Sequence, residues 1–292
     1  MALPVIRTPF TDLLGIEHPV VCAGMGGGAT NGELAGRVSD AGGLGVIGAS
    51  FVPPENVEKM VARVREITAK PFGINLLLFA TEERLDDVLR AEPAVLSTAW
   101  PRDDQDLGAI FARAYHRGIR VMHMAATVAD ALRAAEAGAN VIVAQGNEGG
   151  EHVGEIGTTV IVRQVVKAVA PIPVLAAGGL RRRGTRAALH SERMGSCWNA
   201  VLATQEAPVE AAYKRAVVAG GGDDTIVTTV SHTLSGRDWP GAWAPATNPS
   251  SRHGWAGSLN SADAARRSGR DSTRPKSPTP TTASCGSGSQ PG

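Results

Sequence analysis

The chain has 292 residues, a formal net charge of +1, and charged side chains at 20% of its positions. This near-neutral balance argues against nucleic acid or an anionic membrane as a partner, because those surfaces attract strongly basic proteins. The three cysteines, Cys22, Cys197 and Cys285, have unrelated spacings that indicate neither a disulfide framework nor a metal site. The sequence also predicts no signal peptide and no membrane helix, which needs roughly 18 consecutive apolar residues. We therefore expect a cytoplasmic protein.

Short apolar runs alternate with helical periodicity through the first two thirds of the chain. The runs predicted to be strands are 19–23, 44–47, 72–78, 94–97, 120–124, 140–144 and 173–177. Helices are predicted between them, the first of which begins at a capping box formed by Thr30 and Glu33 and continues to Ser39. Strand–helix units of roughly 25 residues are typical of a parallel sheet, and seven even units favour an α/β fold of the TIM (β/α)8 barrel type over an open doubly wound sheet.

The segment 141–154, VIVAQGNEGGEHVG, carries the strongest functional signal. A β-branched run opens directly into a glycine-rich turn that contains Gln145, Glu148 and His152. In parallel α/β proteins, catalytic groups collect in the loops at the carboxyl ends of strands. Glycines also cluster after predicted strands one, two, six and seven, where they let backbone N–H groups approach a ligand. One such cluster alone indicates only a tight turn, but four on the same rim favour a bound cofactor.

Five segments of the chain together resemble the nitronate monooxygenases, formerly called 2-nitropropane dioxygenases, and their FMN-dependent barrel relatives. The matching segments are 19–50, 70–78, 121–154, 172–180 and 202–229, which cover most of residues 8–180 and 202–240. The resemblance implies oxidation of alkyl nitronates or nitroalkanes by O2 to a carbonyl compound and nitrite, with one FMN bound at the carboxyl rim of the barrel.

The resemblance also implies a role for individual residues. His152 lies where the family has its catalytic histidine, although Glu151 stands where the family usually has a second glycine. Asn75 would hydrogen-bond the flavin, and Gly178 and Gly179 would offer N–H groups to the phosphate. The full set of residues expected at the cofactor is Gly24, Met25, Gly26, Asn75, Gln145, Gly149, Gly150, Gly178 and Gly179.

A histidine suits this chemistry because a neutral imidazole near pH 7 is a suitable base for a nitroalkane carbon acid. A substrate supplied as the nitronate has already lost that proton, so His152 should matter less for it. His123 also ends a predicted strand, but its neighbours Met122 and Met124 favour a packing role at the rim.

Two other functions are compatible with the same motifs. A flavin-dependent enoyl-acyl-carrier-protein reductase shares the barrel and the glycine-rich histidine loop, and it would require NAD(P)H. A flavin-binding barrel without catalytic turnover is the other alternative. The sequence does not distinguish among possible nitronates, nor does it indicate an oligomeric state.

The family pattern breaks between residues 181 and 200. Four arginines occur within 181–186, and 181–200 holds Thr185 as its one β-branched residue, so a buried eighth strand is hard to place. A compensated frameshift would explain the break. Trp198–Val201 requires the codons TGG AAY GCN GTN, which one base later can encode Gly-Thr-Arg-Phe, the family's signature after strand eight. A true family variant with a basic loop is the alternative.

A second break follows Gly241. Residues 242–292 contain one leucine, Leu259, and no Val, Ile, Phe or Met. Such a segment buries too little apolar area to offset its ordering entropy. We therefore expect a barrel domain over 1–241 and a disordered, non-native tail over 242–292, with a basic interaction tail as the alternative.

Overall fold

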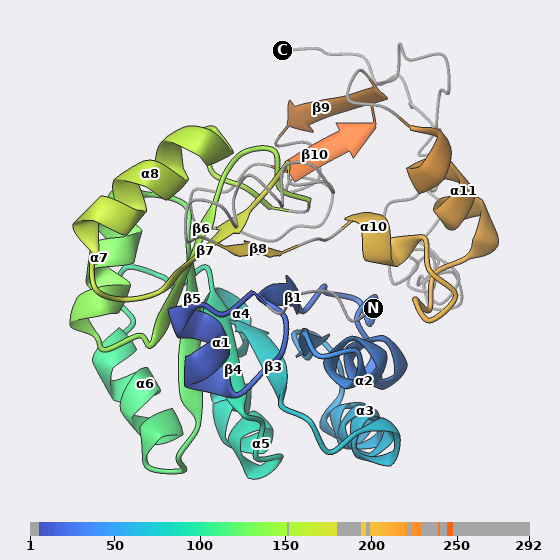
Figure 1. Cartoon of the computed structure of the whole chain (residues 1–292), viewed down its shortest axis with the longest axis horizontal. Helices are drawn as coiled ribbons and strands as arrows, with labels where there is room; N and C mark the ends of the chain where they lie inside the picture. The colour runs from blue at the N-terminus through green and yellow to red at the C-terminus, as the bar shows by residue number, and fades with distance from the viewer. Residues whose placement is uncertain are drawn as a thin grey trace, which may run out of the picture. The chain divides into compact units, whose positions relative to one another are not determined.

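The computed structural model describes residues 6–150, 152–179, 194–196, 199–220, 224–228, 239 and 244–247 (Figure 1). The predicted basic loop at 181–186 and most of the predicted tail lie outside these described residues. Within them, the chain from β1 to β8 forms a closed barrel of parallel strands in sequence order, which confirms the predicted TIM-barrel fold. The strands are β1 Val20–Cys22, β2 Leu44–Gly48, β3 Phe72–Leu77, β4 Val95–Ala99, β5 Arg120–Ala125, β6 Val141–Gln145, β7 Val174–Ala177 and β8 Met194–Ser196.

Helices follow most of the strands and surround the barrel (Figure 1). The helices that connect strands are α2 Gly32–Asp40, α3 Pro54–Ile67, α4 Leu78–Thr81, η1 Glu82–Arg84, α5 Leu85–Arg90, α6 Leu107–Tyr115, α7 Val128–Glu136 and α8 Thr158–Ala168. The other described elements are α1 Pro9–Leu14, α10 Asn199–Leu202, α11 Ala211–Ala219, and the antiparallel pair β9 Thr225–Thr228 and β10 Ala244–Thr247. β10 falls within the segment 242–292, for which the sequence predicts a disordered tail.

Side chains alternate between two apolar layers along each strand, as the two-residue period of a strand requires. On β6, Ile142 packs outward in the large cluster beneath the helices, whereas Val141 and Val143 face the barrel interior. Phe10 and Leu14 of α1 join the interior cluster. The same alternation turns Gln145, the last residue of β6, toward the interior at its carboxyl end.

Strand β8 lies in the segment where the sequence makes a buried eighth strand hard to place. Its residues pair in parallel with β7 and with β1, Met194 opposite Leu175 and Gly195 opposite Val20. The barrel therefore has no exposed edge between β7 and β1. Side-chain composition gives little sign of this strand because β propensity is weak, and the partners on both sides supply backbone hydrogen bonds regardless of side-chain type.

The start of α2 also differs from the prediction. The N-cap is Asn31, whose side chain accepts from the backbone N–H of Leu34 at 3.0 Å. The hydroxyl of Thr30 instead accepts from the N–H of Met25 at 3.1 Å and donates to the carbonyl of Ala23 at 2.9 Å. Thr30 thus stabilises the turn after β1, which shapes one side of the barrel mouth.

Candidate functional site

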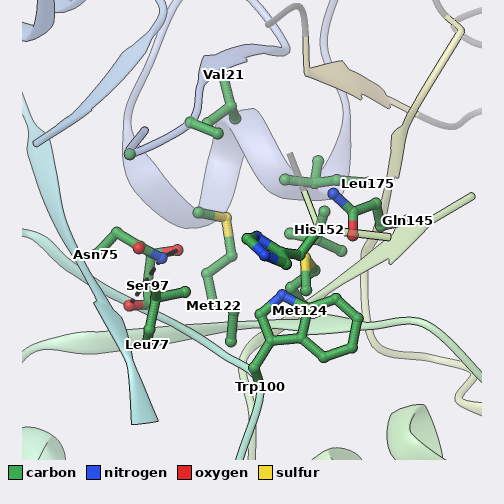
Figure 2. A pocket seen from close by; sticks show the side chains of 14 residues that line it. Val21, Asn75, Leu77, Ser97, Trp100, Met122, Met124, Gln145, His152 and Leu175 are labelled. Atoms are coloured by element: carbon green, nitrogen blue, oxygen red, sulfur yellow. Dashed lines mark hydrogen bonds between the residues drawn. The ribbon is translucent and has the colours of Figure 1, made fainter. Parts of the chain in front are cut away.

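A pocket opens at the carboxyl ends of the strands, where the interior layer of the barrel ends (Figure 2). The empty space within it is about 530 Å³, a volume that includes the open solvent at its mouth. Four polar side chains, those of Asn75, Ser97, Gln145 and His152, face an otherwise mainly apolar lining. The lining residues are Val21, Ala23, Gly24, Asn75, Leu77, Ser97, Ala99, Trp100, Met122, Met124, Val143, Gln145, His152 and Leu175.

Asn75 and Ser97 form a hydrogen-bonded pair on neighbouring strands. The Asn75 amide Nδ2 donates to the Ser97 hydroxyl at 3.1 Å and lies 3.4 Å from the Ser97 carbonyl oxygen. A β-carbon on Gly24 would lie 2.4 Å from Cβ of Asn75. A glycine is therefore required at position 24 for the chain after β1 to pass so close to Asn75.

Gln145 presents an unsatisfied acceptor in this pocket. Its side chain is 2% exposed, and its Oε1 is buried without a hydrogen-bond partner among the described residues. Leaving such an atom unpaired costs about 1–3 kcal/mol, so buried acceptors are normally satisfied. A ligand that places an N–H or O–H donor beside Gln145 would remove this cost, and a cofactor with polar ring edges fits the requirement.

His152 reaches the pocket from the loop between β6 and α8. Figure 2 shows its imidazole directed into the pocket, with Asn75 and Ser97 on the opposite side. The next two residues fix the loop: Val153 is fully buried, and a β-carbon on Gly154 would lie 2.8 Å from Cβ of Ala126. The described part of the loop therefore brings the predicted histidine to the predicted rim.

The aromatic ring of Trp239 covers the His152 imidazole. The two ring centroids are 3.3 Å apart and the planes differ by 9°, a stacked arrangement. Trp239 also contacts Phe79, with ring centroids 4.6 Å apart. Trp239 packs against the small cluster of Ala99, Trp100 and Ala126 at the ends of β4 and β5.

The loops that follow β6 and β7 contact each other beside this site. Gly178 has a φ of +108° and Gly179 a φ of +62°. A β-carbon on Gly178 would lie 2.7 Å from the Thr158 hydroxyl oxygen. The N–H of Gly179 donates to the carbonyl of Glu148 at 3.2 Å. That amide, expected at a phosphate, is engaged within the protein in this structure.

The remaining predicted cofactor residues have different surroundings. Met25 is buried with Cys22 and Leu34 in a cluster outside the pocket lining. A β-carbon on Gly26 would meet nothing within 4 Å, so that part of the turn borders open space. Gly149 approaches Gln145 closely, since a β-carbon there would lie 3.1 Å from its Nε2, and Gly150 is half-buried. The structure thus brings Gly24, Asn75, Gln145 and His152 into one pocket.

His123 lies in the barrel wall and not at the rim. It faces outward from β5, is 1% exposed, and packs with its ring centroid 5.7 Å from that of Phe111 on α6. Its Nδ1 is 2.7 Å from the Thr98 hydroxyl. Burial, aided by the charge of Arg133, lowers the pKa of His123 from 6.5 to about 3. An imidazole that is buried beneath the helices and neutral near pH 7 has a packing role.

Sequence reasoning missed several residues that shape the pocket. Ser97 could have been suspected from its inward place on β4, but its pairing with Asn75 depends on strand register. Trp100 adopts a φ of +52°, which is uncommon for a residue with a side chain and often occurs at functional sites. Trp239 is more than 80 residues from His152, so no local pattern could have joined them.

The described residues contain neither a metal-binding cluster nor a membrane-spanning helix. No group of three or more His, Cys, Asp or Glu side chains among them could hold a metal ion. No described helix is long and apolar enough to cross a membrane.

The chain is similar in sequence to a known protein family and to several named proteins. The family model described as nitronate monooxygenase matches residues 7–91 and 80–240. The (3aS,4S,5R,7aS)-5-hydroxy-7a-methyl-1-oxo-octahydro-1H-indene-4-carboxyl-CoA dehydrogenase of Mycobacterium tuberculosis is 36% identical over 230 residues, covering 77% of this chain and 63% of that protein. A Staphylococcus haemolyticus protein named "Probable nitronate monooxygenase" is 30% identical over 278 residues, covering 78% of this chain and 76% of the relative. The match thus spans less than two thirds of the dehydrogenase.

Solved structures agree with the family assignment. FabK from Thermotoga maritima superposes with a TM-score of 0.72 at 31% identity, over 83% of this chain and 75% of that one. The nitroalkane oxidase from Streptomyces ansochromogenes gives a TM-score of 0.66 at 27% identity, over 75% of each chain. The names of these relatives cover more than one oxidoreductase activity.

Proposed function

Because this chain belongs to the nitronate monooxygenase family, we propose that it uses FMN and O2 to oxidise alkyl nitronates, or their parent nitroalkanes, to a carbonyl compound and nitrite. The observation that carries the proposal is that His152, Asn75 and Gln145 line the same largely apolar pocket. Such a pocket suits a small substrate with an apolar chain and one polar head.

The residues present fit a flavin. The unsatisfied Gln145 Oε1 would accept from a donor on the ring, and Asn75 offers a further polar contact. The open space beside Gly26 leaves room for a planar group. When bound, FMN would supply the electron-transfer chemistry that protein side chains lack.

His152 would prepare the substrate. In a nitroalkane, the imidazole accepts the proton on the carbon next to the nitro group, and the C–H electron pair moves into a C=N bond as negative charge passes to the nitro oxygens. The nitronate formed is the species that is oxidised. Two nitronates and one O2 give two carbonyl compounds and two nitrite ions, which balances atoms and charge. The apolar wall would exclude water from the substrate carbon.

The first test is of binding and turnover in the purified full chain. We expect flavin absorption bands near 370 and 450 nm, and we expect O2 uptake with nitrite release when propyl-2-nitronate is added without nicotinamide. Nitrite without O2 uptake, or flavin without either, would contradict the proposal. Flavin reduction by NADH or NADPH in anaerobic stopped flow would favour a reductase instead.

The second test isolates His152. His152→Asn should lower kcat/KM for a nitroalkane by roughly 10²–10⁴-fold, the usual contribution of a general base. The same variant should oxidise the pre-formed nitronate within a few-fold of the unmodified chain, since no proton has to be removed. Equal losses on both substrates would show that His152 does not act as the base.

A further inference from the structure

Trp239 gives His152 a contact that the proposed chemistry does not itself require. The indole and imidazole rings are nearly parallel, with centroids 3.3 Å apart. Aromatic rings at this separation constrain each other, because rotation of either ring about its side-chain bonds would produce overlap. The Trp239 side chain is half-buried, and it also packs against the cluster of Ala99, Trp100 and Ala126.

The indole is itself held by a rigid support. Its second aromatic neighbour, Phe79, lies just after β3, and the backbone N–H of Phe79 donates to the carbonyl of Trp100 at 3.0 Å. Trp100 in turn has a left-handed backbone and a buried side chain. Trp239 therefore connects the His152 imidazole to the rim formed by β3 and β4.

The His152 loop needs such a support. Glycines occupy positions 149, 150 and 154 around the histidine, and glycine lowers the cost of alternative backbone conformations. The buried Val153 and the close approach of Gly154 to Ala126 fix where the loop lies, but they do not set the plane of the imidazole. A stacked ring does so directly.

We propose that Trp239 is the positioning residue for His152, which holds the imidazole plane so that a ring nitrogen faces the substrate carbon. This inference rests on the proposed function for its consequence, but not for its geometry. Proton transfer depends on heavy-atom distance and alignment, and a displacement of about 1 Å can cost roughly 10²-fold in rate.

The geometry can be tested without turnover. In full-length protein with 13C-labelled histidine, the ring protons of His152 should be shifted upfield by the indole ring current, with His152→Gln used to assign them. Trp239→Leu should return them to ordinary values, and Trp239→Phe should leave an intermediate shift. Resonances that do not move in Trp239→Leu would overturn the stacking argument.

Kinetic measurements on Trp239 variants distinguish a positioning role for Trp239 from a role in general stability. Trp239→Leu should lower kcat for a nitroalkane roughly 10–100-fold, with a smaller change in KM and little change with the pre-formed nitronate, and Trp239→Phe should recover most of the loss. Phe111→Leu is the matched control, since it removes the aromatic neighbour of His123 in the barrel wall. It should lower thermal stability without altering kcat.

The possible outcomes are distinguishable. Equal losses on nitroalkane and nitronate in Trp239→Leu, or no rescue by Trp239→Phe, would overturn the positioning role. If the unmodified chain oxidises neither substrate, the proposed function fails. The histidine resonances would then still decide whether Trp239 fixes the imidazole.

Discussion

The carboxylate of Glu148 accepts a hydrogen bond from the backbone N–H of Thr158 at 2.8 Å, so the His152 loop itself caps the first turn of α8. The carbonyl of Glu148 accepts from Gly179 in the loop after β7. Burial alone would raise the pKa of Glu148, but the hydrogen bonds from the Thr158 hydroxyl and amide outweigh it and lower the pKa. One residue thereby connects α8 to the loops after β6 and β7.

Replacing Glu148 should therefore weaken the cap. Glu148→Ala is expected to destabilise the fold by about 1 kcal/mol, the usual value of a lost helix cap, and Glu148→Gln should cost less because its side-chain oxygen still accepts. Thermal unfolding at pH 7 measures both, with Glu58→Ala on the exposed face of α3 as control. Because folding lowers the carboxylate pKa, the stability difference between the unmodified chain and the Glu148→Ala variant should shrink as pH falls below 4.5, the ordinary pKa of a glutamate. A difference that grew in acid would contradict this account.

His123 should make stability depend on pH. The pKa of His123 is about 3 in the folded protein, whereas an ordinary histidine has a pKa of 6.5, so the unfolded chain binds more protons between those two values. Above pH 6.5, His123 therefore does not lower the free energy of unfolding. As the pH drops from 6.5 toward 3, the free energy of unfolding falls by at most about 1.4 kcal/mol per pH unit. His123→Gln can still hydrogen-bond Thr98 but does not titrate in this range. Chemical denaturation at several pH values should show a flatter profile for this variant than for the unmodified chain.

Substitutions of Gly178 and Gly26 should have different effects, one on stability and the other on ligand binding. Gly178→Ala should destabilise the protein by more than about 1 kcal/mol, because φ is +108° and a β-carbon would lie 2.7 Å from the Thr158 hydroxyl oxygen. Gly26→Ala meets nothing within 4 Å and should leave the melting temperature unchanged. If Gly26 borders the flavin, as the family resemblance implies, this variant should still weaken FMN binding in fluorescence titrations. Unchanged FMN affinity would remove Gly26 from the cofactor site.

If the break at 181–200 is a frameshift, restoring the family's sequence there should strengthen FMN binding. Replacing Trp198–Val201 by Gly-Thr-Arg-Phe should raise the fraction of purified protein that holds FMN, since each charge-assisted hydrogen bond to a phosphate contributes about 1.5–3 kcal/mol. The ratio of absorbance near 450 nm to that at 280 nm measures occupancy. Unchanged occupancy would count against the frameshift hypothesis, as would an encoding DNA without a family-like peptide in the shifted frame.

The sequence by itself determined the first seven strands and the end of the barrel at which polar residues gather. Apolar runs and helical periodicity are local signals, and the two-residue period of β6 is enough to turn Gln145 inward once Val141 and Val143 are in the core. His152 follows the same strand within a few residues, so its place at the rim was also readable.

Only the tertiary structure decided which distant groups meet. Thr30 could have capped α2, but its hydroxyl bonds to Ala23 and Met25 because the turn after β1 folds back over it. β8 exists because β7 and β1 offer open hydrogen-bonding edges on both sides, not because its residues favour a strand. The stacking of Trp239 on His152 depends on the closure of the whole barrel mouth, a long-range event that no local sequence pattern encodes.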